Sequence, residues 1–199
     1  MDRSHVKIPD EAILALAVLR DCLGQSLQAA YLHGSAVNGG LRPDSDVDLL
    51  VICNQPLTPE TGARLIDKLM RISGRHPAKP GMPRCLEVMI FLTQDLAALS
   101  YPACCAFIYG EWLRNEFETG TVPQPHTDPE YTLVLAQAGQ EAISLLGPER
   151  AQLLPPVSRD EVRRAIADAL PGLLGNIQGD ERNVLLTLAR MWYTLETGK

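Results

Sequence analysis

Two aspartates at the head of an apolar run place the strongest constraint on how this chain folds. Asp46 and Asp48 flank Val47 and lead into the apolar residues 49–53, in the stretch DSDVDLLVIC. Acidic residues form strands poorly, and residues two apart on a strand point to the same face. The two carboxylates therefore repel each other on one side of the strand. This arrangement predicts a compensating charge at that position, and a metal ion is the natural candidate.

The residues around this run predict a mixed α/β domain. The spacing of apolar residues, together with end signals, predicts helices over 9–24 and 58–74. Apolar runs bounded by turn residues predict strands over 26–34, 44–54 and 84–93. This order of elements indicates helices packed against a small mixed sheet.

A third carboxylate stands among apolar residues in the last of these strands. Glu87 shares a strand face with Cys85, Met89 and Phe91. If this strand pairs antiparallel with the strand at 44–54, all three carboxylates converge on one patch. Such a set of oxygen ligands suits Mg²⁺, which also recruits the phosphates of a nucleoside triphosphate.

A Gly-Ser pair upstream predicts the phosphate contact. Gly34 lets a ligand approach the backbone closely, and the Ser35 hydroxyl with the amides of a helix starting at 35–38 can bind a triphosphate. The loop-like NGGLRPDS separates this turn from the aspartates. An Asp-x-Asp alone is often a solvated strand end, whereas Gly-Ser, Asp-x-Asp and a later strand carboxylate together indicate a nucleotide site.

The overall composition is that of a soluble globular protein. Of 199 residues 46% are hydrophobic, and 18 basic against 24 acidic residues give a net charge of −6, which argues against a nucleic-acid partner. No apolar run approaches the roughly 20 residues that span a bilayer, and the N-terminus lacks the apolar core of a signal peptide. The five cysteines form no CxxC motif. We expect a cytoplasmic monomer with reduced thiols that binds neither nucleic acid nor membrane.

The second half of the chain is predicted to be mainly helical. The pattern beyond residue 95 predicts helices over 128–147, 158–170 and 180–198. The Pro-rich LLPPV at 153–157 predicts a boundary between one domain over 1–156 and a helical domain over 157–199. Because two helices make a thin domain, we expect the natural protein to continue and the helical domain to be truncated here.

These motifs resemble those of the nucleotidyltransferases of the DNA polymerase β superfamily. More narrowly, they resemble the bacterial aminoglycoside adenylyltransferases, which modify spectinomycin and in some members also streptomycin. The matching stretches, spread from residue 34 to 193, are GSAVNGGLRPDSDVDLLV, LEVMIF, YGEWLR and GDERNVLLTLARMWY. The resemblance implies an α+β fold, with a polymerase-β-like nucleotidyltransferase domain followed by an all-helical C-terminal domain.

The resemblance implies roles for the motif residues in binding ATP and metal. It implies two Mg²⁺ ions held by three carboxylates, namely Asp46, Asp48 and Glu87. Glu87 would also be the general base. Ser35, beside Gly34, would contact the triphosphate. Arg190 would bind the ATP phosphates from the second domain, with an ordinary surface position on its helix as the alternative.

The same resemblance implies a site for a cationic antibiotic. Trp112, in YGEW, would pack against the drug, because a Trp face attracts amine-bearing rings. Asp180, in GDERN, would hydrogen-bond the drug, with Asn183 as a neighbour. The plainer alternatives are that Trp112 is a buried core aromatic and that Asp180 caps the following helix.

Three departures from the family pattern bear on function. His33 stands where the family usually has Tyr or Phe, which we interpret as a tolerated packing change. Pro171 and Asn176 stand where members that also accept streptomycin carry Trp and Asp, which favours spectinomycin. A Lys that helps to hold ATP in the family would lie beyond Lys199.

The expected activity is the Mg²⁺-dependent transfer of AMP from ATP to a hydroxyl of an aminocyclitol or aminoglycoside antibiotic, which confers resistance. The 9-hydroxyl of spectinomycin is the preferred acceptor. One alternative is an enzyme that also modifies the 3″-hydroxyl of streptomycin. Two others are a minimal nucleotidyltransferase that modifies a protein, and a catalytically incomplete fragment that only binds drug or nucleotide.

Overall fold

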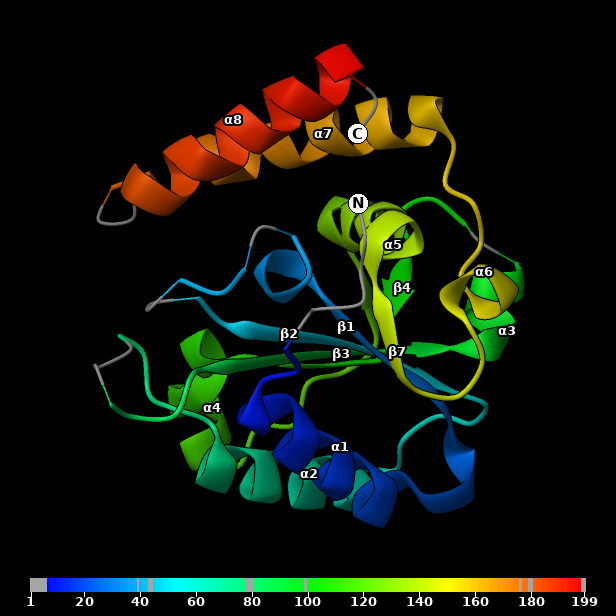
Figure 1. Ribbon diagram of the computed structural model, residues 1–199, viewed down its shortest axis with the longest axis vertical. Helices are drawn as coiled ribbons and strands as arrows, with labels where there is room; N and C mark the ends of the chain where they lie inside the picture. Colours follow the sequence, from blue (N-terminus) through cyan, green and yellow to red (C-terminus); the bar gives the residue numbers. More distant parts are fainter. Residues whose placement is uncertain are drawn as a thin grey trace.

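A five-stranded mixed sheet forms the centre of the fold (Figure 1). The computed structural model describes residues 7–38, 40–42, 45–77, 81–98, 100–175, 177–178 and 181–197, with the side chain of Asn183 excepted. The strands lie in the order β5-β3-β2-β1-β7. Their bounds are Leu27–His33 (β1), Val47–Cys53 (β2), Leu86–Leu92 (β3), Phe107–Tyr109 (β5) and Ile143–Leu146 (β7). β2 and β3 run parallel, and the other neighbouring pairs are antiparallel.

Helices cover both faces of this sheet. α1 (Asp10–Leu23) and α2 (Pro59–Ile72) lie on one face, and α5 (Pro129–Glu141) lies on the other (Figure 1). Thr58 caps α2, because its side chain accepts a hydrogen bond from the amide of Thr61 at 3.2 Å. The first two predicted helices and the first three predicted strands are therefore confirmed, each within a few residues.

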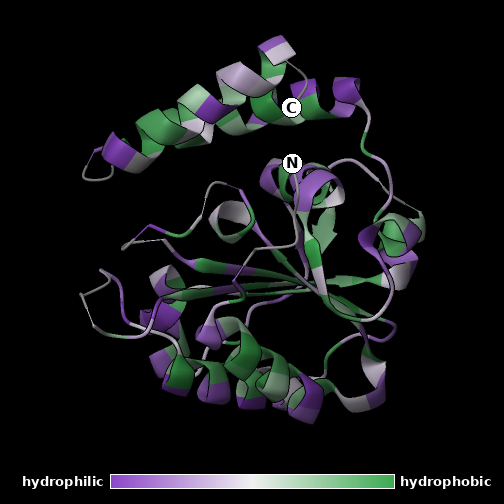
Figure 2. Cartoon of the chain, viewed as in Figure 1, coloured by the Kyte–Doolittle hydropathy of each residue, from purple (hydrophilic) through white to green (hydrophobic). Residues whose placement is uncertain are grey.

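The side chains of β2 alternate between two hydrophobic cores. Leu49 and Val51 pack into the core beneath α1 and α2. Leu50 and Ile52 pack into the core beneath α5. Figure 2 shows the result, with hydrophobic strands in the middle and hydrophilic residues on the outer sides of the helices. Even-numbered residues of β2, Asp48 among them, therefore point to the α5 side.

The helix predicted over 128–147 is confirmed as far as Glu141 and wrong over residues 142–147. α5 ends at Glu141, and residues 143–146 form β7, which pairs antiparallel with β1 at the edge of the sheet. Gly147 closes this strand at φ +81°, where an added Cβ would lie 2.3 Å from the carbonyl oxygen of Gln28. Pairing with β1 satisfies backbone groups that a longer helix would leave open at the sheet edge. This tertiary contact outweighs the local helical pattern.

The region from residue 93 to 127 is also less helical than predicted. It consists of short elements, which are α3 (Thr93–Ala97), β4 (Cys104–Cys105), β5, η3 (Glu111–Leu113), α4 (Arg114–Glu118) and β6 (His126–Thr127). β4 pairs with β6 in a second, two-stranded sheet. Prolines and glycines interrupt this region repeatedly, namely Pro102, Gly110, Gly120, Pro123 and Pro125. They prevent long helices.

Two long helices form a further layer beyond α5. α7 (Arg159–Gly175) and α8 (Glu181–Thr197) lie side by side there, after the short α6 (Arg150–Leu153) (Figure 1). α7 packs against α5 through the buried Ala165 and Ile166. α7 also runs past its predicted end at residue 170. It continues to Gly175 and contains Pro171.

The predicted domain boundary falls in the irregular residues between α6 and α7, and it stays a prediction. Within the described ranges, no helix has both the length and the apolar character needed to cross a membrane.

Candidate active site

Three polar residues stand in one row across the middle of the sheet. His33 pairs with Asp48 across β1 and β2, and Asp48 pairs with Glu87 across β2 and β3. Directly paired residues on neighbouring strands project to the same face, and here that face is the one beneath α5. The predicted antiparallel pairing of β2 with β3 is wrong, because α2 forms the crossover that a parallel pair requires. The predicted meeting of the carboxylates survives this correction, since the parallel register aligns Asp48 with Glu87.

Burial and mutual repulsion raise the pKa of these carboxyl groups. Burial raises the pKa of Asp48 to about 7, and the nearby charge of Asp46 contributes in the same direction. Burial also raises the pKa of Glu87 well above its usual range, with further increases from Asp48 and Asp46. The pKa of Asp46 is raised too, again mainly by burial. The three acids are thus close enough to interact, and they cannot all be charged without a neighbouring cation.

The donor chemistry of this group fits Mg²⁺, although the side chains do not form a finished metal site. In the part of the chain that the structure describes, no three Asp, Glu, His or Cys side chains are arranged to hold a metal ion. Carboxylate oxygens are nonetheless the ligands that Mg²⁺ prefers. A cation would relieve the repulsion that raises the pKa of Asp48 and Glu87. The assignment of Asp46, Asp48 and Glu87 as metal ligands stays a prediction.

The Gly-Ser turn directly contacts the Asp48 side chain at the start of β2. Gly34 has φ +66°, and an added Cβ would lie 2.0 Å from Oδ2 of Asp48. A backbone hydrogen bond from Ser35 to the Asp48 carboxylate lowers the pKa of Asp48, partly opposing burial. The turn is a single 3₁₀ turn over Gly34–Ala36, so the predicted helix N-terminus at 35–38 is wrong. The amides of Val37 and Asn38 bind the carbonyl of Gly34 instead, which leaves the Ser35 hydroxyl as the predicted phosphate contact.

Arg190 brings a positive charge to the carboxylates from the layer of α7 and α8. It lies on α8 with its side chain exposed, and its charge lowers the pKa of Asp48. Its Nε donates a hydrogen bond to the carbonyl oxygen of Leu186 at 3.4 Å. The structure therefore brings Arg190 toward the predicted phosphate site, while its contact with ATP stays a prediction.

Trp112 is an exposed residue at the same end of the sheet as Glu87. It lies in η3 with 55% of its surface exposed, so the alternative of a buried core aromatic is wrong. Tyr109 pairs with Val88 in an antiparallel register. The residues that follow Tyr109 therefore continue toward Glu87, the neighbour of Val88. The exposed indole is therefore available to a ligand at this end of the sheet.

The other predicted antibiotic contacts cannot be placed. Asp180 lies outside the described residues, as does Asn176, and the side chain of Asn183 is not described. Pro171 is the one member of the predicted specificity pair that the structure describes, and it lies within α7.

Two further residues near the carboxylates, Glu130 and His33, were not predicted as site residues. Glu130, in the first turn of α5, is close enough to raise the pKa of Glu87. His33 is buried, and its Nδ1 has no hydrogen-bond partner. Burial lowers the pKa of His33 to about 4, so the imidazole is neutral. The helix start at 128 could have placed Glu130 in a first turn, but what it faces depends on the packing of α5 on the sheet.

Arg84 holds the loop that leads to Asp46. Its Nη1 donates hydrogen bonds to the carbonyl oxygens of Arg42 and Ser45, and its backbone amide donates to the Glu11 carboxylate at 2.9 Å. The charge of Arg84 also lowers the pKa of Asp46. The sequence offers no local signal for this role, because Arg84 and Ser45 lie far apart along the chain.

Comparison with known proteins shows matches to two protein families and to several characterised enzymes. The family described as aminoglycoside adenylyltransferase, C-terminal domain, matches residues 152–199, and the polymerase beta nucleotidyltransferase family matches residues 22–80. A spectinomycin 9-adenylyltransferase of Staphylococcus aureus is 48% identical over 193 residues, covering 97% of this chain and 74% of that protein. An aminoglycoside (3″) (9) adenylyltransferase of Klebsiella pneumoniae is 35% identical, with 97% and 74% covered.

A solved structure has the same fold. It is the crystal structure of a spectinomycin adenyltransferase from Enterococcus faecalis with ATP and spectinomycin, and it is 37% identical to this chain. The superposition has a TM-score of 0.90 and covers 95% of this chain and 77% of that one. The chain therefore belongs to the aminoglycoside adenylyltransferase family, within the polymerase β nucleotidyltransferase superfamily.

Proposed function

We propose that this protein transfers AMP from ATP to the 9-hydroxyl of spectinomycin in a Mg²⁺-dependent reaction. The observation that carries the proposal is the pairing of Asp48 with Glu87 beside the Gly34–Ala36 turn. This arrangement places two carboxylates, which can bind a metal ion, next to a backbone turn that a nucleotide phosphate can approach closely. Asp46, Asp48 and Glu87 would hold the metal, which would supply positive charge to the phosphate oxygens.

Glu87 acts as the general base in this proposal. The drug hydroxyl is a weak nucleophile, so a carboxylate beside it must accept its proton as the new bond forms. The drug oxygen then bonds to the α-phosphorus of ATP, and the bond from that phosphorus to the bridging oxygen breaks. Pyrophosphate leaves, and the hydroxyl proton remains on Glu87.

The other predicted residues orient the two substrates. Ser35 and Arg190 bind the phosphates from opposite sides, the first from the turn after β1 and the second from α8. Trp112 offers its exposed face to the amine-bearing ring of the drug. Asp180 and Asn183 are further drug contacts in this proposal, on the basis of the family resemblance.

Spectinomycin is preferred over streptomycin for two reasons. Pro171 stands where dual-specificity members carry a Trp. The relative named as a spectinomycin 9-adenylyltransferase is 48% identical, against 35% for the relative with the (3″) (9) name. An enzyme that accepts both drugs is the second candidate.

Pyrophosphate release from ATP tests the proposal. We expect release that requires both Mg²⁺ and spectinomycin, a product that is heavier by one AMP, and no release with streptomycin. Release with both drugs would support the dual-specificity enzyme. Spectinomycin binding by calorimetry without release would contradict catalysis and support a binding function. Labelling of a protein from radioactive ATP, without drug modification, would support the protein-modifying alternative.

A further inference from the structure

We propose that Gly110 and Glu111 are positioning residues that hold the Trp112 indole in one pose beside Glu87. The inference deepens the proposed function, because it takes Trp112 as the platform on which the antibiotic lies. It concerns two residues that do not contact the drug themselves. They would set the affinity for the drug by fixing the residue that does.

Gly110 provides the surface on which the indole lies. An added Cβ at Gly110 would stand 2.3 Å from Cη2 and Cζ3 of Trp112 and 2.6 Å from Cε3. The benzo edge of the ring therefore lies directly on the backbone of Gly110, at a distance that only a residue without a side chain permits. The backbone there is extended, with φ −160°. Any residue can adopt that conformation, so the reason for glycine is space for the ring.

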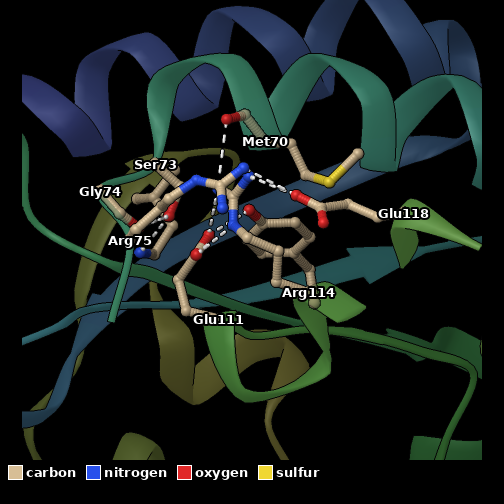
Figure 3. A network of polar contacts seen from close by, with 9 residues as sticks. Met70, Ser73, Gly74, Arg75, Glu111, Arg114 and Glu118 are labelled. Carbon is tan, nitrogen blue, oxygen red and sulfur yellow. Dashed lines mark hydrogen bonds and ion pairs between the residues drawn. The ribbon is translucent and has the colours of Figure 1, made fainter. Parts of the chain in front are cut away.

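Glu111 anchors the backbone next to Trp112. Its carboxylate is buried, with 3% of the side chain exposed. It accepts hydrogen bonds from Nε and Nη2 of Arg114 at 2.6 and 2.9 Å, and from the hydroxyl of Tyr109 at 2.6 Å (Figure 3). A two-pronged ion pair of this kind is directional as well as strong. Residue 111 therefore has little freedom to rotate, and Trp112 begins from a fixed backbone.

Arg114 ties this anchor to the end of α2. Its Nη2 also donates to the carbonyl oxygen of Met70 at 3.3 Å (Figure 3). Ser73 follows Met70 by three residues, and its hydroxyl accepts a hydrogen bond from the amide of Leu86 at 3.0 Å. Leu86 directly precedes Glu87 in β3. The network therefore joins the segment that carries Trp112 to the segment that carries Glu87.

A fixed indole benefits drug binding for a physical reason. Trp112 is half exposed, and an exposed side chain that moves freely loses conformational entropy when a ligand immobilises it. The indole ring rests on Gly110, and the neighbouring residue Glu111 is held by its ion pair with Arg114. The conformational entropy of the Trp112 side chain is then lost when the protein folds, so that drug binding does not have to offset it. The position of the platform relative to Glu87 is set in the same way.

Gly110→Ala is the sharpest test, because the new methyl group would lie within 2.6 Å of three ring atoms of Trp112 and must displace the ring. The ring is exposed and can move, so the protein should fold with a melting temperature close to that of the parent. We expect the KM for spectinomycin to rise about tenfold, as for the loss of one good aromatic contact. The KM for ATP and kcat should stay unchanged. Gly139→Ala, which adds a Cβ to open space on α5, is the matched control.

The mobility of the indole gives a readout that does not depend on activity. The chain has two tryptophans, and Trp192→Phe leaves Trp112 as the single tryptophan, which can be excited selectively over the tyrosines. In that background, we expect high fluorescence anisotropy in the parent and lower anisotropy in Gly110→Ala and Glu111→Gln. Glu111→Gln leaves the Arg114 charge buried with a weaker partner and can impair folding. Gly110→Ala keeps the test decisive in that case.

The outcomes separate this inference from the proposed function. Unchanged anisotropy in Gly110→Ala would overturn the inference, whatever the enzyme does. Lower anisotropy with an unchanged KM for spectinomycin would overturn the link from the ring pose to drug binding. If the parent shows no adenylylation, the proposed function fails, and the anisotropy still decides whether Gly110 and Glu111 hold the ring.

Discussion

Asp48 and Glu87 lie directly opposite each other on the parallel strands β2 and β3, with both side chains on the face beneath α5. Burial and the like charge of its neighbours raise the pKa of each carboxyl group. Asp48, with a pKa of about 7, is only partly ionised near neutral pH in the absence of a cation. This pair therefore links three properties of the site, namely metal binding, proton binding and stability.

Glu87→Gln should abolish turnover while the protein still binds ATP. The change removes the proton acceptor but keeps the size and shape of the side chain. We expect kcat to fall at least about a hundredfold, the usual contribution of a general base, and the ATP dissociation constant to change much less. Pyrophosphate release and calorimetry with ATP measure the two effects. Glu116→Gln, in the exposed part of α4, is the matched control, and normal turnover in Glu87→Gln would remove Glu87 from the mechanism.

Binding of Mg²⁺ should release protons at neutral and acidic pH. A carboxylate must be ionised to bind the metal, and Asp48, with its pKa near 7, is about half protonated at pH 7. The apparent affinity for Mg²⁺ should therefore increase as pH rises from 6 to 8 and then level off. Calorimetric titrations in buffers of different ionisation enthalpy count the protons. Asp48→Asn should bind Mg²⁺ more weakly and release fewer protons, and an affinity that does not vary over this pH range would contradict the raised pKa.

The carboxylate pair was partly predictable from the sequence. Strand alternation alone put Asp46 and Asp48 on one face and Glu87 among apolar residues of a later strand. The direction of pairing was predictable too, because a helix of 14 residues between two adjacent strands is the usual parallel crossover. The antiparallel expectation did not take account of the helix predicted at 58–74 between the two strands.

Other parts of the structure depend on contacts that leave no local trace. Residues 143–146 have a helical pattern and become a strand only because the outer edge of β1 is open to them. The contact of Arg114 with Met70 joins residues 44 positions apart. The unpartnered Nδ1 of His33 likewise reflects the packing around it and not a motif. Such features could not be predicted from the sequence, because they depend on contacts between segments that are far apart along the chain.

Gly34→Ala should damage the site far more than it damages a comparable turn elsewhere. The new Cβ would collide with the Asp48 carboxylate, and φ +66° is unfavourable for any residue with a side chain. We expect a loss of stability of about 1–3 kcal/mol together with a loss of most Mg²⁺-dependent activity. Gly24→Ala separates the two causes, because Gly24 has φ +53° with no atom near an added Cβ. Equal loss of activity in both variants would contradict a specific contact between the turn and Asp48.

His33 should make the protein less stable in acid. Its pKa is about 4 in the folded protein and about 6.5 when exposed, so below pH 6.5 the unfolded chain binds a proton that the folded protein does not. The resulting loss of stability accumulates as pH falls from 6.5 to 4 and reaches at most about 3 kcal/mol. It is absent above pH 6.5. Asp48 and Glu87 have the opposite effect, because their raised pKa lets the folded protein retain protons that the unfolded chain loses.

His33→Phe keeps an aromatic ring and removes this titration. The contributions of Asp48 and Glu87 are common to both proteins, so they largely cancel when the variant is compared with the parent. We expect the difference in unfolding free energy between pH 7 and pH 4.5 to shift in favour of the variant by about 2–3 kcal/mol. Urea unfolding at the two pH values, with a chelator present, measures this difference. Parallel pH profiles for parent and variant would mean that His33 is already charged, or solvated, in the folded protein.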